Sequence, residues 1–170
     1  ASEEQNIFVV GTHDGSDLER LVERPWYRSA HIHIFGWELS VHAYAAAKHR
    51  LATTQNVQLF HRGVSRTAGT MMAVTDVNGS EMGGLMPCEE PVDPVKAPWC
   101  IGRQQTKVKV DAWGDVVRER AIDEVAYALI DVEGHEVAVI RGMQLESNAR
   151  AFPVFQYELG GTWSDSRHDG

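Results

Sequence analysis

The chain alternates between short apolar runs and segments whose apolar residues recur at helical spacing, and this alternation limits the folds it can adopt. The run at 7–10 is apolar at every position, which is typical of a strand buried on both faces. Further strands are expected at 31–35, 57–60, 106–110, 127–131 and 154–159, with a short element at 71–74. Helices are expected after Ser16 and at 41–51, 113–120 and 137–148. Strand–helix–strand repeats of this length predict an α/β fold with a mainly parallel sheet flanked by helices.

Finer features of these elements can also be predicted. Ser16 and Glu19 have the spacing of a capping box at the start of the first helix. Ser40 is suited to cap the second helix. The strand at 106–110 is expected at a sheet edge.

Composition narrows the possible functions. The 170 residues carry 16 Lys and Arg against 24 Asp and Glu, a formal net charge of −8. An acidic chain without a basic cluster is poorly suited to bind nucleic acid or an anionic membrane. No apolar stretch is long enough to span a membrane, and the first residues do not resemble a signal peptide. We therefore expect a soluble protein, of the cytoplasm or an organelle rather than secreted, although the sequence does not identify the compartment.

The stretch from residue 78 to about 105 differs from the rest, because it holds four of the six prolines and both cysteines and shows little periodicity. Loops of this length inside a compact domain are usually functional or disordered. We expect one domain over residues 1–170, with this stretch as a long loop insert. Cys88 and Cys100 either form a bridge at the base of the loop or remain free thiols.

Gly11 and Gly15 bracket the turn that follows the first strand. In open α/β sheets, ligands bind at the carboxyl ends of the strands, and glycine lets the backbone approach them closely. Asp14, Asp17 and Glu19 crowd the start of the next helix, where they would repel a diphosphate. They suit a ligand with a cationic end and no phosphate, and S-adenosylmethionine is such a ligand. Alternatively, these acids are there because the helix dipole favours them.

Glu38 follows the second expected strand. An acid at this place hydrogen-bonds the ribose hydroxyls in nucleotide-binding folds. The alternative is a solvated turn residue.

Asp131, Glu133, His135 and Glu136 surround Gly134 directly after a buried strand. Such a density of titratable groups is uncommon, and it either serves a site or caps the following helix. Zinc-protease helices need a second histidine four residues after the first. Here a valine stands at that position, and the further oxygen ligands of a calcium loop are missing. We therefore expect no metal site.

Residues 127–143, with the run Asp-Val-Glu-Gly-His-Glu at their centre, resemble the signature of FkbM-type S-adenosylmethionine-dependent methyltransferases. Other parts of that family resemble segments 10–17, 34–39, 57–65, 108–113 and 154–159. The resemblance covers about residues 7–163 and implies the class I methyltransferase form of the Rossmann-like sheet. It also implies S-adenosylmethionine as the cofactor and methyl transfer to a hydroxyl of a sugar or glycosylated small molecule.

The resemblance implies roles for individual residues as well. The cofactor would contact Gly11, Thr12, His13, Asp14, Gly15, Glu38, Gly63 and Val64. Glu38 would hold its ribose, and Gly63 and Val64 would lie near its adenine. The acceptor side would be shaped by Asp131, Glu133, His135 and Glu136. His135, with His13 second, is the candidate base for the acceptor's proton, because the pKa of histidine lies near neutrality.

Two departures from the family's pattern lead to a second hypothesis. The family carries an acid two residues before the first glycine, where this chain has Val9, so cofactor binding would weaken unless Asp14 or Asp17 takes its place. The family's sheet also ends in an antiparallel hairpin, and none is expected after 154–159. The alternative function is a non-catalytic methyltransferase-like subunit of a larger complex, with a protein partner covering the sheet edge after Leu159.

Overall fold

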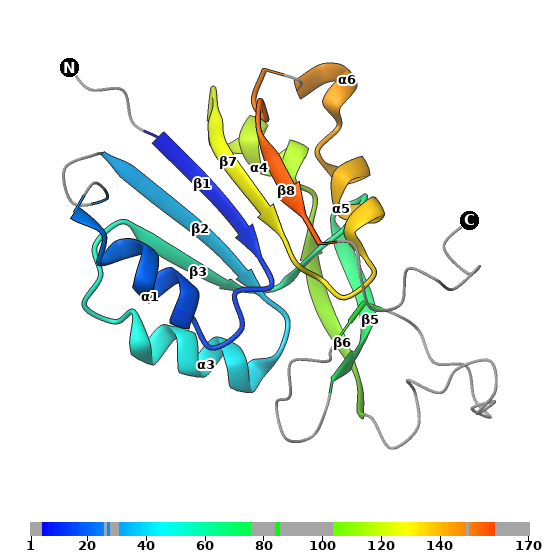
Figure 1. Cartoon of the computed structure of the whole chain (residues 1–170). Helices are drawn as coiled ribbons and strands as arrows, with labels where there is room; N and C mark the ends of the chain where they lie inside the picture. Colours follow the sequence, from blue (N-terminus) through cyan, green and yellow to red (C-terminus); the bar gives the residue numbers. More distant parts are fainter. Residues whose placement is uncertain are drawn as a thin grey trace.

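A computed structural model describes residues 5–25, 27, 31–75, 84–85, 104–148 and 150–158 of the chain. Most of the expected loop insert, with Cys88 and Cys100, lies outside the described residues, and so do Leu159 and any hairpin after it. The described residues form two sheets and the helices that pack on them (Figure 1).

The larger sheet is parallel throughout. Its strands are β1 (Gln5–Val10), β2 (Ile32–Glu38), β3 (Val57–His61), β7 (Val125–Ile130) and β8 (Phe155–Tyr157). They pair in the order β3-β2-β1-β7-β8, so the chain starts in the middle, moves to one edge and later returns to the other side. The expectation of an α/β fold with a mainly parallel sheet is confirmed.

Helices cover both faces of this sheet (Figure 1). One face carries α1 (Ser16–Val22) and α3 (Val41–Arg50), and the other carries α4 (Trp113–Glu119), α5 (Glu136–Gly142) and α6 (Leu145–Asn148). Side chains of β1 alternate between the two layers, as they must in a strand. Ile7 and Val9 pack with Leu18 of α1, whereas Phe8 and Val10 pack with α4 and α5. The predicted burial of this strand on both faces is confirmed.

Aromatic rings fill the layer under α4. The ring centroid of Phe8 lies 5.0 Å from that of Trp37 and 5.4 Å from that of Trp113, in tilted and edge-on arrangements. Such pairs stabilise by about 0.5–1.5 kcal/mol beyond the area they bury. Both indoles are fully buried, so this cluster fixes β1, β2 and α4 relative to one another.

A second, three-stranded sheet follows β3. In it, β4 (Gly63–Val64) pairs in parallel with β6 (Gln104–Asp111), and β5 (Gly69–Thr75) pairs antiparallel with the other side of β6. The prediction of an edge strand at 106–110 is wrong, because this strand lies in the middle. Its buried valines alternate with exposed lysines, and that pattern indicates one buried face without distinguishing a central strand from an edge strand.

One of the two predicted helix caps is confirmed. The Ser40 side chain accepts a hydrogen bond from a backbone N–H in the first turn of α3. The capping box at Ser16 is wrong: Gly15, in a left-handed conformation, holds the N-cap position of α1, and the N–H of Ser16 is bound by the Asp14 side chain instead. Glu19 instead pairs with Arg50 of α3. Glu19 therefore forms an ion pair between two helices rather than a capping bond at the start of its own helix.

The single helix expected at 137–148 is interrupted. It ends as α5 at Gly142 and resumes as α6 at Leu145, with Gln144 between them at a left-handed φ of 54°. The Gln144 side chain hydrogen-bonds two side chains of α4. These tertiary contacts favour the break between the helices. They cannot be predicted from the spacing of apolar residues.

Gly142 lies where α5 touches the segment after β4. A β-carbon built there would lie 2.1 Å from the carbonyl oxygen of Ser65. We therefore expect Gly142→Ala to lower the free energy of unfolding by about 1–3 kcal/mol through overpacking. Within an ordinary helix the same change raises that free energy by about 1 kcal/mol. Urea unfolding measures the difference.

Glu119→Ala, at the exposed end of α4, is the control for this experiment. It should change the free energy of unfolding by no more than about 0.5 kcal/mol. A Gly142→Ala protein as stable as the wild type would contradict the close packing of α5 on Ser65.

Candidate functional site

A cavity of about 830 Å³ is lined by the carboxyl ends of β1, β2 and β7 and by β4, and it continues along the sheet beside α1 to Gln5, Ile32 and Ala126 near the amino ends of the same strands. Most of the candidate residues named from the sequence line it, namely Gly11, Thr12, His13, Glu38, Gly63, Val64, Asp131, Glu133 and His135. Asp14, Gly15 and Glu136 lie outside the walls that the described residues form. The fold thus brings together turns that are far apart in the sequence.

Gly11 lies where the end of β1 meets the end of β7. Its φ of +84° is left-handed, and a β-carbon built on it would lie 1.7 Å from the carbonyl oxygen of Asp131. The N–H of Asp131 in turn donates to the carbonyl oxygen of Val10 at 3.1 Å. Only glycine fits this approach between two backbones.

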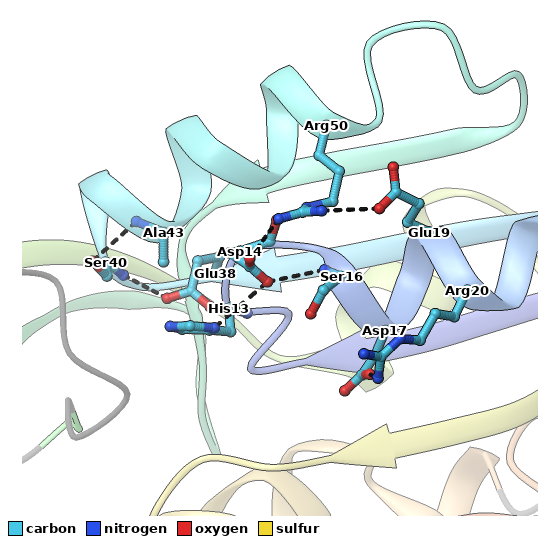
Figure 2. Close-up of polar contacts among 10 residues, drawn as sticks. All are labelled: His13, Asp14, Ser16, Asp17, Glu19, Arg20, Glu38, Ser40, Ala43 and Arg50. Carbon is cyan, nitrogen blue, oxygen red and sulfur yellow. Dashed lines mark hydrogen bonds and ion pairs between the residues drawn. The ribbon is translucent and has the colours of Figure 1, made fainter.

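The Glu38 carboxylate joins the turn after β1 to the end of β2. One oxygen accepts the N–H of His13 and the other accepts the N–H of Ser40, each at 2.7 Å (Figure 2). The side chain is only 8% exposed. Burial raises the pKa of Glu38, and the two backbone N–H groups act in the opposite direction. Each carboxylate oxygen can accept a second hydrogen bond, so Glu38 can bind ligand hydroxyls while it holds the turn.

Asp14 points toward α3, where Arg50 binds it (Figure 2). The guanidinium lies 2.7 Å from the Asp14 carboxylate and 2.9 Å from that of Glu19. The N–H of Ser16, which donates to Asp14 at 3.0 Å, and the charge of Arg50 keep the pKa of Asp14 below its usual value. Two of the three acids expected to attract a cationic ligand are therefore paired with one arginine, whose single positive charge offsets one of their two negative charges.

Asp17 is the remaining acid of this turn, and it does line the cavity. Its side chain is 88% exposed and pairs with Arg20 at 3.1 Å. A pair this exposed contributes about 0–1 kcal/mol, so a ligand can compete for Asp17. Val9, at the position where the resembled family has an acid, also lines the cavity and gives it an apolar wall.

Asp131, Glu133 and His135 line the cavity from the segment after β7. Burial raises the pKa of Asp131 to about 6, and the carboxylates of Glu158 and Glu133 add to the shift. A carboxyl group with that pKa is mostly ionised at neutral pH, yet it binds a proton more readily than an ordinary aspartate. Asp131 is therefore suited to accept a proton from a ligand.

Glu136 occupies a different place from these neighbours. It is only 1% exposed, and its Oε1 accepts the N–H of Gly134 at 3.0 Å. The same oxygen accepts the N–H of Val132 at 3.4 Å. These bonds close the turn, in which Gly134 has a φ of +102°. Glu136 therefore shapes the segment that carries the cavity-lining residues.

Part of the cavity wall comes from the second sheet. Gly63 and Val64 line it, together with Arg62. The Asp111 carboxylate accepts hydrogen bonds from Arg62 at 2.8 Å and from the Trp37 indole N–H at 2.9 Å. These bonds hold the guanidinium in place. The sequence does not predict that Arg62 is held at the cavity wall. Its partner Asp111 lies 49 residues away along the chain, and Asp111 is itself bound by Trp37 of the larger sheet.

Ser65, directly after β4, is a second residue that sequence reasoning missed. Its Oγ lies 2.9 Å from Nε2 of His135. Ser65 is only 4% exposed, so the contact sets a buried hydroxyl against the imidazole. The two residues are 70 positions apart, and no local pattern predicts such a pair.

Over residues 5–25, 31–75, 104–148 and 150–158, no three side chains of His, Cys, Asp or Glu gather in a way that could hold a metal ion. Each helix in the described part of the chain is too short or too polar to cross a membrane. The part of the cavity at the carboxyl ends of the strands, where the candidate residues gather, is the candidate site.

Replacing Asp131 should change how stability depends on pH. The folded chain raises the pKa of this carboxyl from 3.8 to about 6, so its stabilising contribution is present when it is protonated and is lost as pH rises through about 6. The asparagine of Asp131→Asn does not titrate, so the variant has no such contribution to lose as the pH rises. We therefore expect the Tm of the variant, relative to wild type, to increase as the pH rises from 4 to 7.

Asp123→Asn is the matched control, because Asp123 is exposed in the loop before β7. Its Tm difference from wild type should stay nearly constant over the same pH range. Thermal unfolding followed by circular dichroism measures both series. A constant difference for Asp131→Asn would contradict the raised pKa.

No protein-family model and no curated protein matches the chain. Among solved structures, a methyltransferase FkbM from Methylobacillus flagellatus is similar, with a TM-score of 0.51 and 12% identity over 85% of this chain and 30% of that one. A SAM-dependent methyltransferase from Geobacter sulfurreducens, in complex with S-adenosyl-L-homocysteine, matches 41% of this chain and 27% of its own, with a TM-score of 0.30 and 22% identity.

The chain thus spans 30% of the length of the first of these structures and 27% of the second. At 12% identity, the first likeness establishes the fold and nothing finer. It agrees with the parallel sheet and the helices on its two faces. The described residues therefore have an α/β fold of the class I methyltransferase type.

Proposed function

We propose that this chain is the cofactor-binding core of an S-adenosylmethionine-dependent methyltransferase. The observation that carries the proposal is the presence of Gly11 and Glu38 at one cavity. A backbone without a side chain ends β1, and a buried carboxylate ends the neighbouring β2. In nucleotide-binding α/β folds, these two positions receive the phosphate or its equivalent and the ribose. The class I methyltransferase fold supports the same function.

The chemistry of the cavity fits this cofactor. A diphosphate needs positive potential, whereas Asp17 and Glu38 place carboxylates on the described walls beside α1. S-adenosylmethionine has no phosphate and carries an ammonium and a sulfonium, so carboxylates attract it. Thr12 lines the same cavity, and its hydroxyl is buried with no hydrogen-bond partner among the described residues. A bound ligand can supply that partner.

The cofactor's parts are assigned to different strand ends. Gly11 would approach the methionine end, and Asp17 would replace the acid that the resembled family has at the position of Val9. Glu38 would accept hydrogen bonds from the ribose hydroxyls. Gly63 and Val64 of β4 would lie near the adenine.

When bound, the cofactor would supply a methyl carbon on a sulfonium, which an oxygen nucleophile can attack in line with S-adenosylhomocysteine as the leaving group. The chain's own residues orient the acceptor and receive the proton of its hydroxyl. Asp131 and His135 line the same wall and are the two candidates for that proton. Glu133 borders them, and Glu136 holds their turn closed.

The proposed acceptor is a hydroxyl of a sugar or a glycosylated small molecule. Carboxylates and an imidazole on the wall after β7 offer several hydrogen bonds, which suits a compound with many hydroxyls. The alternative function is a non-catalytic methyltransferase-like subunit with a protein partner at the β8 edge. It differs in predicting a cavity that binds no cofactor.

Isothermal titration calorimetry with S-adenosylhomocysteine tests the proposal. We expect saturable binding with a stoichiometry of one. Glu38→Gln should weaken it about 10–100-fold, because a hydrogen bond to a charged group contributes about 1.5–3 kcal/mol. Glu19→Gln is the matched control, since that carboxylate pairs with Arg50 and does not line the cavity. Its affinity should equal that of the wild type.

Thermal unfolding of both variants accompanies the titrations, because Glu38 also holds the turn after β1. A variant that keeps the wild-type Tm and loses affinity has lost binding alone. If the folded wild type binds no S-adenosylhomocysteine at millimolar concentration, the enzyme proposal fails and the non-catalytic alternative replaces it.

A further inference from the structure

We propose that Ser65 is a positioning residue that fixes the neutral His135 ring in the Nδ1–H tautomer, so that His135 donates a hydrogen bond at the site and Asp131 takes the acceptor's proton. The tautomer follows from the contact with Ser65 and does not depend on the proposed function. The division of roles between His135 and Asp131 rests on the proposed methyl transfer.

Ser65 is firmly placed beneath His135. Its N–H donates to the carbonyl oxygen of Asp111 at 2.9 Å. Its own carbonyl oxygen lies against α5, at the point where Gly142 leaves no space for a β-carbon. The Oγ is then 2.9 Å from Nε2 of His135, which is an ordinary hydrogen-bond distance. Both the second sheet and α5 therefore direct this hydroxyl at the imidazole.

The direction of the hydrogen bond follows from the burial of Ser65. Among the described residues, Nε2 of His135 is the hydrogen-bond partner of this hydroxyl, and the Ser65 side chain makes no second hydrogen bond there. At 4% exposure, a hydroxyl hydrogen without an acceptor would cost about 1–3 kcal/mol. The hydroxyl therefore donates to Nε2. A neutral imidazole has one lone pair and one N–H, so the ring hydrogen of His135 lies on Nδ1.

This arrangement makes neutral His135 a hydrogen-bond donor. A proton taken up at Nε2 would turn the ring into a donor at both nitrogens. The buried hydroxyl hydrogen of Ser65 would then lose its acceptor. Proton uptake by His135 is therefore opposed by a contact that lies outside the cavity.

Asp131 has no such obstacle. It lines the same wall as His135, and burial raises its pKa to about 6. In the proposed step, the acceptor's oxygen forms a bond to the methyl carbon as the carbon–sulfur bond breaks, and that electron pair remains on sulfur. The hydroxyl proton passes to the Asp131 carboxylate.

Nuclear magnetic resonance of the imidazole nitrogens in the ligand-free protein tests the tautomer. The chain has 8 histidines, and the signals that disappear in His135→Gln identify those of His135. At a pH of about 9, well above the ordinary histidine pKa of about 6.5, we expect long-range proton–nitrogen spectra to give the Nδ1–H pattern for His135. An Nε2–H pattern in the wild type overturns the proposal without any variant.

Ser65→Ala removes the hydroxyl and should abolish the Nδ1–H pattern, with the ring shifting toward Nε2–H. Ser147→Ala is the matched control, because that hydroxyl, on α6, donates to the carbonyl oxygen of Gln144. It should leave the His135 signals unchanged. Ser65→Thr restores a hydroxyl and should restore the pattern. An unchanged Nδ1–H pattern in a folded Ser65→Ala protein overturns the role of Ser65.

The spectra and the titrations with S-adenosylhomocysteine test separate hypotheses, and either one can be overturned without the other. If the cofactor analogue does not bind, the proposed function fails, and the tautomer is still measured in the free protein. If the analogue binds and His135 is in the Nε2–H form, the proposed function stands and the division of roles is overturned.

Discussion

The close approach of Gly11 to the carbonyl oxygen of Asp131 is the constraint on which the site depends. The strands β1 and β7 are neighbours in the sheet, so their carboxyl ends emerge together and both following turns face one cavity. A side chain at Gly11 would push the two turns apart. The turn after β1 is then tied to β2 by Glu38, and the turn after β7 is closed on itself by Glu136. Gly11 thus allows the two turns to approach each other, and the carboxylates of Glu38 and Glu136 fix their conformations.

The parts of the fold with a local signal could be predicted from the sequence. The apolar run of β1 and the cap at Ser40 depend on neighbouring residues, and Glu38 needed only its place at a strand's carboxyl end. Contacts between distant segments could not be predicted. Asp14 belonged to the expected ligand turn, yet its carboxylate binds Arg50 of α3. Such partners are chosen by how helices pack on the sheet, and neither periodicity nor spacing encodes that packing.

The second sheet is joined to the first by polar contacts. Asp111 of β6 accepts hydrogen bonds from the Trp37 indole of β2 and from Arg62 beside β4, while its carbonyl oxygen accepts the N–H of Ser65. Buried polar groups are costly unless every one is paired, and here one residue satisfies donors from three segments. The antiparallel pair of β5 and β6 is therefore held in a fixed relation to the cavity wall, although in the described part of the chain β6 does not pair with any strand of the larger sheet.

Arg50 has a consequence for how molecules reach the cavity. Its single positive charge offsets one of the two negative charges of Asp14 and Glu19, which lie outside the walls, and it does not pair with the wall carboxylates Asp17 and Asp131. Arg50 therefore weakens the negative field beside α3, whereas the wall carboxylates keep a negative field at the cavity. Such a field guides cations by diffusion and raises their rate of encounter, over a range of about 8 Å at physiological salt. Arg50 therefore limits how much negative potential lies outside the cavity, and the ionic strength sets the distance over which that potential attracts cations.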